Sequence, residues 1–182
     1  MEDFKACLQS EFAPFGRLTS AQVVQLDQHY ELLLRWNQKI NLTRITALKD
    51  AVTHHYCESL YLASKLPSGP LKIVDIGSGA GFPGIPVAVY RSDCSVELVE
   101  ANQRKAVFLA ESIRVLGISN AHVSANRAEY LQSRYNCVVS RAVRPADVLG
   151  LGLAPDIFIL GDTGEKLPWG RGRYLFHVKQ GL

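Results

Sequence analysis

The chain has 182 residues, of which 47% are hydrophobic and 20% charged, and its net charge is +3 at pH 7. This is the composition of a soluble globular protein, and the small positive charge permits a nucleic-acid partner without requiring one. No apolar run reaches the roughly 20 residues of a membrane span, and the polar start of the chain is unlike a signal peptide. The four cysteines are scattered without a Cys-x-x-Cys pair, which argues against a zinc or disulfide framework. We therefore expect a cytoplasmic protein with no membrane partner and no metal.

Three helices are predicted before the first strong breaker, at residues 1–13, 19–39 and 49–66. The second begins at a capping box, in which Thr19 is followed three residues later by Gln22. The Pro67–Pro70 segment, rich in proline and glycine, then breaks the chain. We expect a helical N-terminal cap over residues 1–69 and a second unit over residues 70–182.

From residue 71 the pattern changes to short apolar runs that alternate with helical stretches. Strands are expected at residues 71–76, 95–99, 122–124, 137–139, 156–160 and 173–178, and helices at 83–90, 102–116 and 146–151. The inward residues of the helix at 102–116 are predicted to be Val107, Phe108, Ile113 and Leu116. Residues 164–172 are expected to form a loop that leads directly to the last strand. The alternation predicts an α/β fold with a mostly parallel sheet.

The segment Ile73–Pro86 is the most informative stretch of the chain. A short apolar strand ends there in a turn with glycines at positions 77, 79 and 81, and Pro83 suits the first turn of the following helix. Glycine tolerates a positive φ and lets a ligand approach the backbone closely. In an open parallel sheet, ligands bind at the carboxyl ends of the strands. We therefore expect a ligand at this turn, whereas an empty tight corner is the plain alternative.

Two kinds of ligand compete for this turn. Gly79, Gly81 and Gly84 formally match the dinucleotide fingerprint, which favours a nicotinamide-dependent oxidoreductase. Counted instead from Gly77, which closes the strand, the sixth position is Phe82. A bulky ring there is expected to form a wall against an adenosine or methionine moiety. This favours S-adenosylmethionine, which has no pyrophosphate to bind.

Further candidates follow the neighbouring strands at the same edge of the sheet. Glu100 ends the second strand, where its carboxylate can accept hydrogen bonds from both ribose hydroxyls, or else be a solvated charge. Ala128 and Glu129 follow the third strand, where an adenine would lie beside the Glu129 backbone N–H; a surface helix start is the alternative. Arg141 follows the fourth strand and could hold a phosphate, a guanine edge or the cofactor carboxylate, or form a structural ion pair.

The ordered set of these motifs resembles the ribosomal RNA small subunit methyltransferase G family, also called glucose-inhibited division protein B, over about residues 20 to 145. The motifs that carry the resemblance are Trp36-Asn37-x-x-Ile40-Asn41-Leu42-Thr43, His55-x-x-Glu58-Ser59-Leu60, the run Val74–Pro86, Arg127-Ala128-Glu129 and Ser140-Arg141-Ala142.

The resemblance implies a class I methyltransferase with a Rossmann-like sheet that uses S-adenosylmethionine to methylate a guanine N7 of 16S ribosomal RNA. Cofactor contacts by motif position are Gly77, Gly79, Phe82, Glu100, Ala128, Glu129 and Arg141. Asn41 and His55 lie in the cap motifs and are expected to face the cofactor or the RNA, together with Arg141; a capping asparagine and a packing histidine are the alternatives. Glu58 departs from the aspartate expected at its position.

The substrate partner implied is small-subunit ribosomal RNA or the assembled subunit, bound by a monomer. No catalytic base is expected, because guanine N7 has an in-plane lone pair and no proton that must leave before attack. The segment from residue 145 is compressed relative to the family pattern, and Ile157–Gly161 lacks the family's lysine. A non-catalytic RNA-binding relative is therefore kept as an alternative, and the glycine fingerprint keeps an NAD-dependent oxidoreductase as another.

Overall fold

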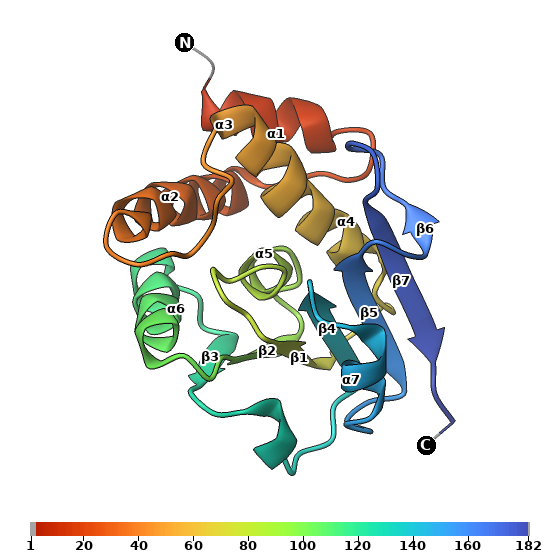
Figure 1. The fold of residues 1–182 in the computed structure, drawn as a ribbon. Helices are drawn as coiled ribbons and strands as arrows, with labels where there is room; N and C mark the ends of the chain where they lie inside the picture. The colour runs from red at the N-terminus through yellow and green to blue at the C-terminus, as the bar shows by residue number, and fades with distance from the viewer. Residues whose placement is uncertain (1–2, 182) are drawn as a thin grey trace.

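The structure, a computed structural model, describes residues 3–181 and contains a seven-stranded sheet in the order β3-β2-β1-β4-β5-β7-β6 (Figure 1). The strands are β1 (Lys72–Ile76), β2 (Ser95–Val99), β3 (Ala121–Ser124), β4 (Cys137–Arg141), β5 (Asp156–Gly161), β6 (Glu165–Lys166) and β7 (Tyr174–Lys179). Strands β1 to β5 are parallel, and β7 runs antiparallel to both β5 and β6. The predicted mostly parallel sheet is confirmed.

The helices that precede the sheet form a cap above it in Figure 1. They are α1 (Phe4–Phe12), α2 (Ser20–Asn37) and one continuous helix made of α3 (Leu48–Ala51), the π-helical η1 (Val52–Cys57) and α4 (Glu58–Lys65). The capping box is confirmed, since the Thr19 side chain accepts from the Gln22 N–H and the Gln22 side chain accepts from the Thr19 N–H. The division of the chain at residue 69 stays a prediction, and its outer limits, residues 1, 2 and 182, lie outside the described residues.

The helices between the strands are α5 (Gly84–Tyr90), α6 (Gln103–Leu116), the short 3-10 helix η2 (Ala128–Tyr130) and α7 (Pro145–Leu149). The positions of α5, α6 and α7 agree with the sequence expectations within a few residues, whereas η2 is not among the expected helices. Asn102 caps α6 by accepting from the N–H groups of residues 104 and 105, and Gly117 ends it in a left-handed conformation.

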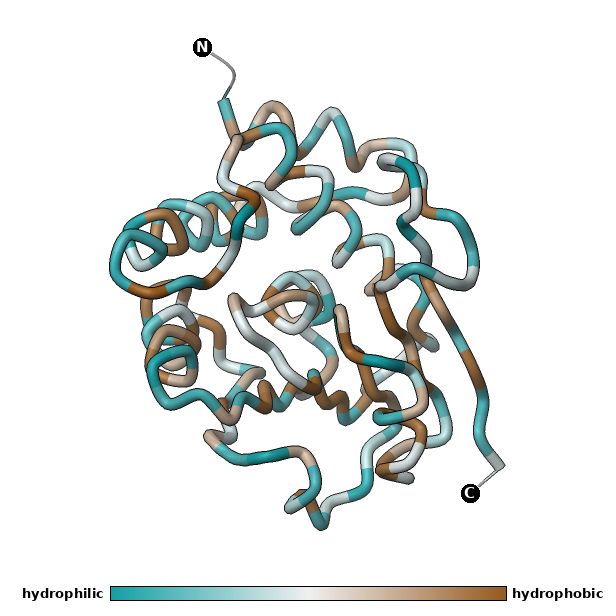
Figure 2. Tube along the Cα trace, viewed as in Figure 1, coloured by the Kyte–Doolittle hydropathy of each residue, from teal (hydrophilic) through white to brown (hydrophobic). Residues whose placement is uncertain are grey.

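Each face of the sheet buries its own set of side chains because neighbouring residues of a strand point to opposite faces. Ile73, Leu98 and Val139 belong to a large core shared with the cap, α5 and α6. Val74, Val99 and Val138 belong to a smaller core covered by α7 and the segment around Tyr135. In Figure 2 the hydrophobic positions accordingly gather along the strands and on the inner sides of the helices. The cap and the sheet therefore form one packed unit.

Two expectations about elements are wrong. Val107 does not face inward but is 56% exposed, because α6 turns Phe108, Leu109 and Ser112 toward the core. The small Ser112 is buried since its hydroxyl donates to the Phe108 carbonyl, which apolar periodicity does not reveal. The loop expected at residues 164–172 contains the short strand β6, which pairs with β7.

Candidate active site

The glycine turn joins the ends of two neighbouring strands. The N–H groups of Gly77 and Ser78 both donate to the Val99 carbonyl at 3.0 Å, so the turn after β1 is attached to the end of β2. Gly77 and Gly79 have φ values of +71° and +56°, a conformation that favours glycine. Gly77 is exposed, and a Cβ added to it would meet only Val143, at 3.6 Å. The floor of the turn is therefore open to a ligand.

The Glu100 carboxylate holds this turn in place. One of its oxygens accepts from the Gly79 N–H at 2.9 Å and the other from the Asn102 N–H at 2.8 Å. The solvated strand-end charge is thus not what the structure shows. Each carboxylate oxygen keeps a second lone pair. The carboxylate can therefore fix the turn and still accept hydrogen bonds from ribose hydroxyls.

Close packing between β1 and α5 occurs at Gly84. A Cβ added there would lie 2.5 Å from Asp75 Oδ2 and closer still to Leu98, and the Gly84 N–H donates to that oxygen at 3.0 Å. Pro83 precedes α5 and is not part of its first turn. Burial raises the pKa of Asp75 to about 7, and its Oδ1 has no hydrogen-bond partner among the described residues.

The Phe82 ring, expected as a wall against the cofactor, is buried in this structure, and its contact with a cofactor stays a prediction. The ring is 1% exposed and lies under the cap, where it stacks on His55 with 4.6 Å between the ring centroids. It also contacts Tyr56 and His29 edge-on, and the Arg141 guanidinium lies 4.9 Å from its centroid. The Phe82 ring therefore connects the glycine turn to the cap, through His55, and to the end of β4, through Arg141.

The other predicted cofactor residues lie at the same edge of the sheet. Strand β3 pairs with β2 so that Ser124 lies opposite Val99, and η2 follows it with Ala128 half-buried and Glu129 exposed. The structure thus places the ends of β1, β2 and β3 next to one another, as a nucleoside site at this edge requires. Contact of these residues with a cofactor stays a prediction.

Arg141 is positioned by a histidine of the π-helical segment. Its Nη1 donates to His55 Nδ1 at 2.7 Å and to the carbonyl of His54. Because a guanidinium only donates, Nδ1 is the acceptor, Nε2 carries the hydrogen, and Thr43 Oγ1 accepts it at 2.8 Å. Burial and the Arg141 charge lower the pKa of His55 to about 2, so the ring is neutral. π-Helical segments often occur at functional sites.

His55 packs as the alternative expects and orients Arg141, and its contact with a cofactor or RNA stays a prediction. It is 3% exposed, and both ring nitrogens are occupied. Asn41 lies elsewhere, in a polar cavity of about 450 Å³ beside Lys39 and the start of α6. Asn37, at the end of α2, fixes the loop that follows. Its side-chain oxygen accepts from the N–H groups of Leu42 and Thr43, and its side-chain nitrogen donates to the Thr43 carbonyl. The predicted RNA-facing residues are thus not one cluster.

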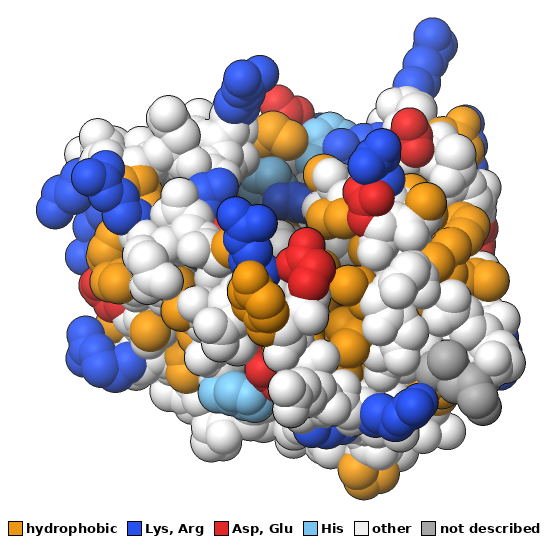
Figure 3. Space-filling model, turned by 60° about the horizontal axis from the view of Figure 1, so that its bottom comes forward, with side chains coloured by type: hydrophobic (Ala, Val, Ile, Leu, Met, Phe, Trp, Pro, Cys, Tyr) orange, Lys and Arg blue, Asp and Glu red, His pale blue; other side chains and the backbone are white. Residues whose placement is uncertain are grey.

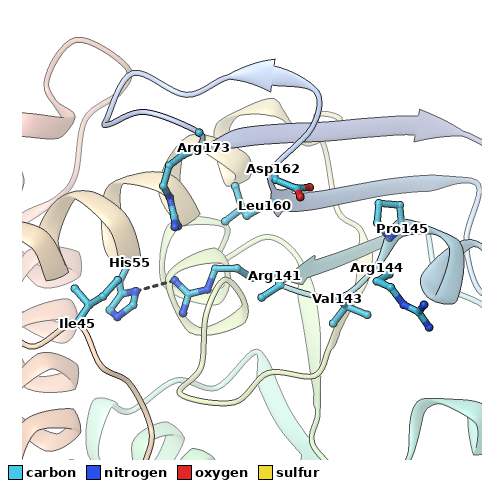
Figure 4. A pocket seen from close by; sticks show the side chains of 12 residues that line it. Ile45, His55, Arg141, Val143, Arg144, Pro145, Leu160, Asp162 and Arg173 are labelled. Carbon is cyan, nitrogen blue, oxygen red and sulfur yellow. Dashed lines mark hydrogen bonds between the residues drawn. The ribbon is translucent and has the colours of Figure 1, made fainter.

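A cavity of about 520 Å³ opens at the ends of β4 and β5 (Figure 4). Its lining includes His55, Arg141, Val143, Arg144, Asp162 and Arg173. Val143 connects it to the glycine turn, and Ala142 there has a positive φ of 58°, a strained conformation for alanine. Figure 3 shows a hollow on this face of the molecule, with histidine and basic side chains at its floor. This volume is typical of a site for a small molecule or a single nucleotide.

Sequence reasoning missed Arg173. Its Nε and Nη2 both donate to the carboxylate of Glu58, which is completely buried on α4. The two residues are 115 positions apart in the sequence. The available signal was Glu58 itself, because a buried carboxylate needs a partner.

The sheet order and the site define the class of protein to which the chain belongs. The fold is similar to that of magnesium protoporphyrin IX methyltransferase from Synechocystis PCC 6803, with a TM-score of 0.52 and 16% sequence identity, covering 81% of this chain and 78% of that one. Coclaurine N-methyltransferase also has a TM-score of 0.52, at 14% identity over 86% of this chain and 56% of that one. The chain has the class I methyltransferase fold.

The family follows from the sequence comparison. Residues 22–154 match the family described as rRNA small subunit methyltransferase G, and the chain belongs to it. It is 38% identical to the protein named ribosomal RNA small subunit methyltransferase G of Pelotomaculum thermopropionicum, covering 72% of this chain and 58% of that protein. The protein of that name from Nitrosomonas europaea is 44% identical, over 65% of this chain and 55% of that protein.

The chain thus spans little more than half the length of the curated relatives it matches. The matched range ends before β5, so Arg173 lies outside it. Within residues 3–181, no helix is both long and apolar enough to span a membrane.

Proposed function

We propose that this chain binds S-adenosylmethionine at the glycine turn and transfers its methyl group to guanine N7 of 16S ribosomal RNA. Gly77 and Gly79 would admit the cofactor to the backbone, Glu100 would accept from its ribose, and Ala128 and Glu129 would border its adenine. The observation that carries this proposal is the Glu100 carboxylate, held against the open turn by hydrogen bonds to Gly79 and Asn102. Membership of the methyltransferase G family supports it.

The chemistry needs positioning more than proton transfer. The cofactor supplies an electrophilic methyl group on a sulfonium, and the chain must hold an acceptor in line with it. Guanine N7 attacks through its lone pair, so no side chain has to remove a proton first. Arg141 lies at the end of β4 next to the turn, and its donors can pair with the O6 of guanine, which leaves N7 free to attack, or with a phosphate. Its orientation is fixed by the neutral His55.

The proposed partner is small-subunit ribosomal RNA, free or assembled in the subunit. Family membership supports this substrate, and the class I fold supports the cofactor. We further propose that the chain acts as a monomer in the cytoplasm.

The test is the transfer of labelled methyl groups from S-adenosylmethionine to small-subunit RNA or subunits. Glu100→Ala and Gly77→Trp are each expected to abolish incorporation, because the first removes the ribose acceptor and the second fills the open floor of the turn. Glu31→Ala, on the exposed side of α2, is the control for a lost carboxylate. Circular dichroism confirms that the variants fold. Undiminished incorporation by both site variants would refute the proposal.

A further inference from the structure

The cavity beside the glycine turn contains two guanidinium groups from distant parts of the chain. Arg141 comes from the end of β4 and Arg173 from the residue before β7, and both line the same space. In Figure 4 the Arg173 side chain points toward the Arg141 guanidinium, whereas Arg141 points toward His55. Each guanidinium donates a hydrogen bond to a residue of the cap, Arg141 to His55 and Arg173 to Glu58.

Arg173 is anchored in a way that leaves part of its fork available. Its Nε and Nη2 donate side by side to the two oxygens of Glu58, and this pairing fixes the plane of the guanidinium. Its Nη1 is not used in that pair. The side chain is 33% exposed, whereas that of Glu58 is fully buried. The Glu58 carboxylate therefore holds Arg173 in place. Arg173 lines the cavity, and its Nη1 takes no part in the pair with Glu58.

Arg141 has no such carboxylate. Among residues 3–181, no carboxylate lies within ion-pair distance of it, and its Nη1 donates only to neutral acceptors, the His55 ring and the His54 carbonyl. Burial and the neighbouring charge of Arg173 lower the pKa of Arg141 to about 10, although Glu58 opposes this, so the side chain is still charged at pH 7. A largely desolvated cation whose partners are all neutral gains from an anion that joins it.

The remaining charges of the cavity lie at its rim. Arg144 is paired with Asp147 and is 84% exposed, so it is engaged outside the cavity. Asp162 is exposed and follows β5, and in Figure 4 its carboxylate is turned away from the two guanidinium groups. The positive charge inside the cavity is thus concentrated at Arg141 and Arg173.

We propose that Arg141 and Arg173 bracket an anion site that takes the phosphate of the acceptor nucleotide. This inference rests on the proposed function. The cavity lies on the β4–β5 side of β1, whereas Glu100 follows β2 on the other side. A cofactor whose ribose lies at Glu100 leaves the β4–β5 side for the acceptor. Two forked donors suit a phosphate, which offers several oxygens, and planar guanidinium groups bind phosphate in a bidentate manner.

The test compares guanosine 5′-monophosphate with guanosine as probes, titrated by calorimetry into the chain saturated with S-adenosylhomocysteine. The wild-type chain is expected to bind the monophosphate at least about tenfold more tightly, the size of one charged hydrogen-bonded contact. The double variant Glu58→Gln/Arg173→Gln is expected to lose this preference. It removes both charges together, so that no buried carboxylate is left unpaired. Arg171→Gln, on the same loop but outside the cavity lining, should keep the preference.

The other source of an anion is the carboxylate of the cofactor, and a second comparison separates the two. If the double variant loses affinity for S-adenosylhomocysteine but not for methylthioadenosine, which lacks that carboxylate, the site belongs to the cofactor and the proposal is wrong. Equal binding of guanosine and its monophosphate by the wild-type chain also overturns it. Repeating the nucleotide titrations without S-adenosylhomocysteine keeps the phosphate test independent of the cofactor proposal. A variant that binds both cofactor analogues normally but has lost the phosphate preference supports the assignment.

Discussion

The two halves of the candidate active site are built in different ways. The half at β1 and β2 consists of a continuous turn and the residue that follows the next strand, and the turn's N–H groups donate to the Glu100 carboxylate and the Val99 carbonyl. The half at β4 and β5 is assembled from the cap, the end of β4 and the residues before β7. Local chemistry thus shapes the first half, whereas the second depends on pairs far apart in the sequence. Substitutions should affect the two halves differently.

The largest effect is expected in the half that depends on distant pairs. Arg173→Ala leaves the buried Glu58 carboxylate with only the His54 ring beside it and should lower the free energy of unfolding by about 3 kcal/mol, the lower end for a buried pair because Arg173 is 33% exposed. Urea unfolding measures this. The double variant Glu58→Gln/Arg173→Gln should recover most of the loss. If Arg173→Ala is as stable as the wild type, the ion pair between Glu58 and Arg173 does not stabilise the fold.

A smaller effect is expected at the turn. Gly84→Ala places a Cβ 2.5 Å from Asp75 Oδ2 and should cost about 1–3 kcal/mol through overpacking of α5 against β1. Gly161→Ala is the matched control, since a Cβ there meets nothing within 4 Å. Thermal unfolding of the two variants would show whether the close approach is real; equal melting temperatures would contradict it.

The cap that joins the two halves should make stability depend on pH. Burial lowers the pKa of His29 to about 3 and that of His55 to about 2, so below pH 6.5 the unfolded chain takes up protons that the folded chain does not. Stability is then lost as the pH falls, by about 1.4 kcal/mol per pH unit for each histidine. Asp75 acts in the opposite direction between pH 7 and about 4, because its folded-state pKa is raised to about 7.

The net loss on acidification therefore corresponds to about one proton. His29→Phe removes one histidine contribution and should flatten the stability profile between pH 6 and 4 by about 1.4 kcal/mol per pH unit. Urea midpoints measured across this range test it, with the exposed His122→Phe as control. A profile unchanged by His29→Phe would show that the buried ring takes up a proton as readily as it does in the unfolded chain.

The smallest effect is expected at the mouth of the cavity. Ala142 has a φ of +58°, so Ala142→Gly relieves backbone strain but gives the unfolded chain more freedom. We expect the free energy of unfolding to rise by no more than about 0.5 kcal/mol, whereas Ala142→Val should lower it by about 1–2 kcal/mol. Melting temperatures check both changes. A valine variant as stable as the wild type would contradict the strain.

The same contrast decides what could be predicted from the sequence. Most helices and strands follow from periodicity, the turn at Gly77 follows from the glycine spacing, and the position of Glu100 follows from the end of a predicted strand. All three signals are local in the sequence. Arg173 and the buried Ser112 could not be found in this way, because one depends on the pairing of β7 with β5 and the other on a hydrogen bond within α6. Phe82 was placed in the correct turn, but its burial depends on how the cap packs.

The central claim is that the glycine turn and Glu100 hold the nucleoside of a methyl donor, with the cavity at Arg141 left for the acceptor. A crystal structure of the chain with S-adenosylhomocysteine tests it most directly. We predict that the ribose hydroxyls lie on the Glu100 carboxylate and that the cofactor contacts the exposed backbone of Gly77. A complex in which the ligand fills the cavity between Arg141 and Arg173 without touching Glu100 would contradict the account.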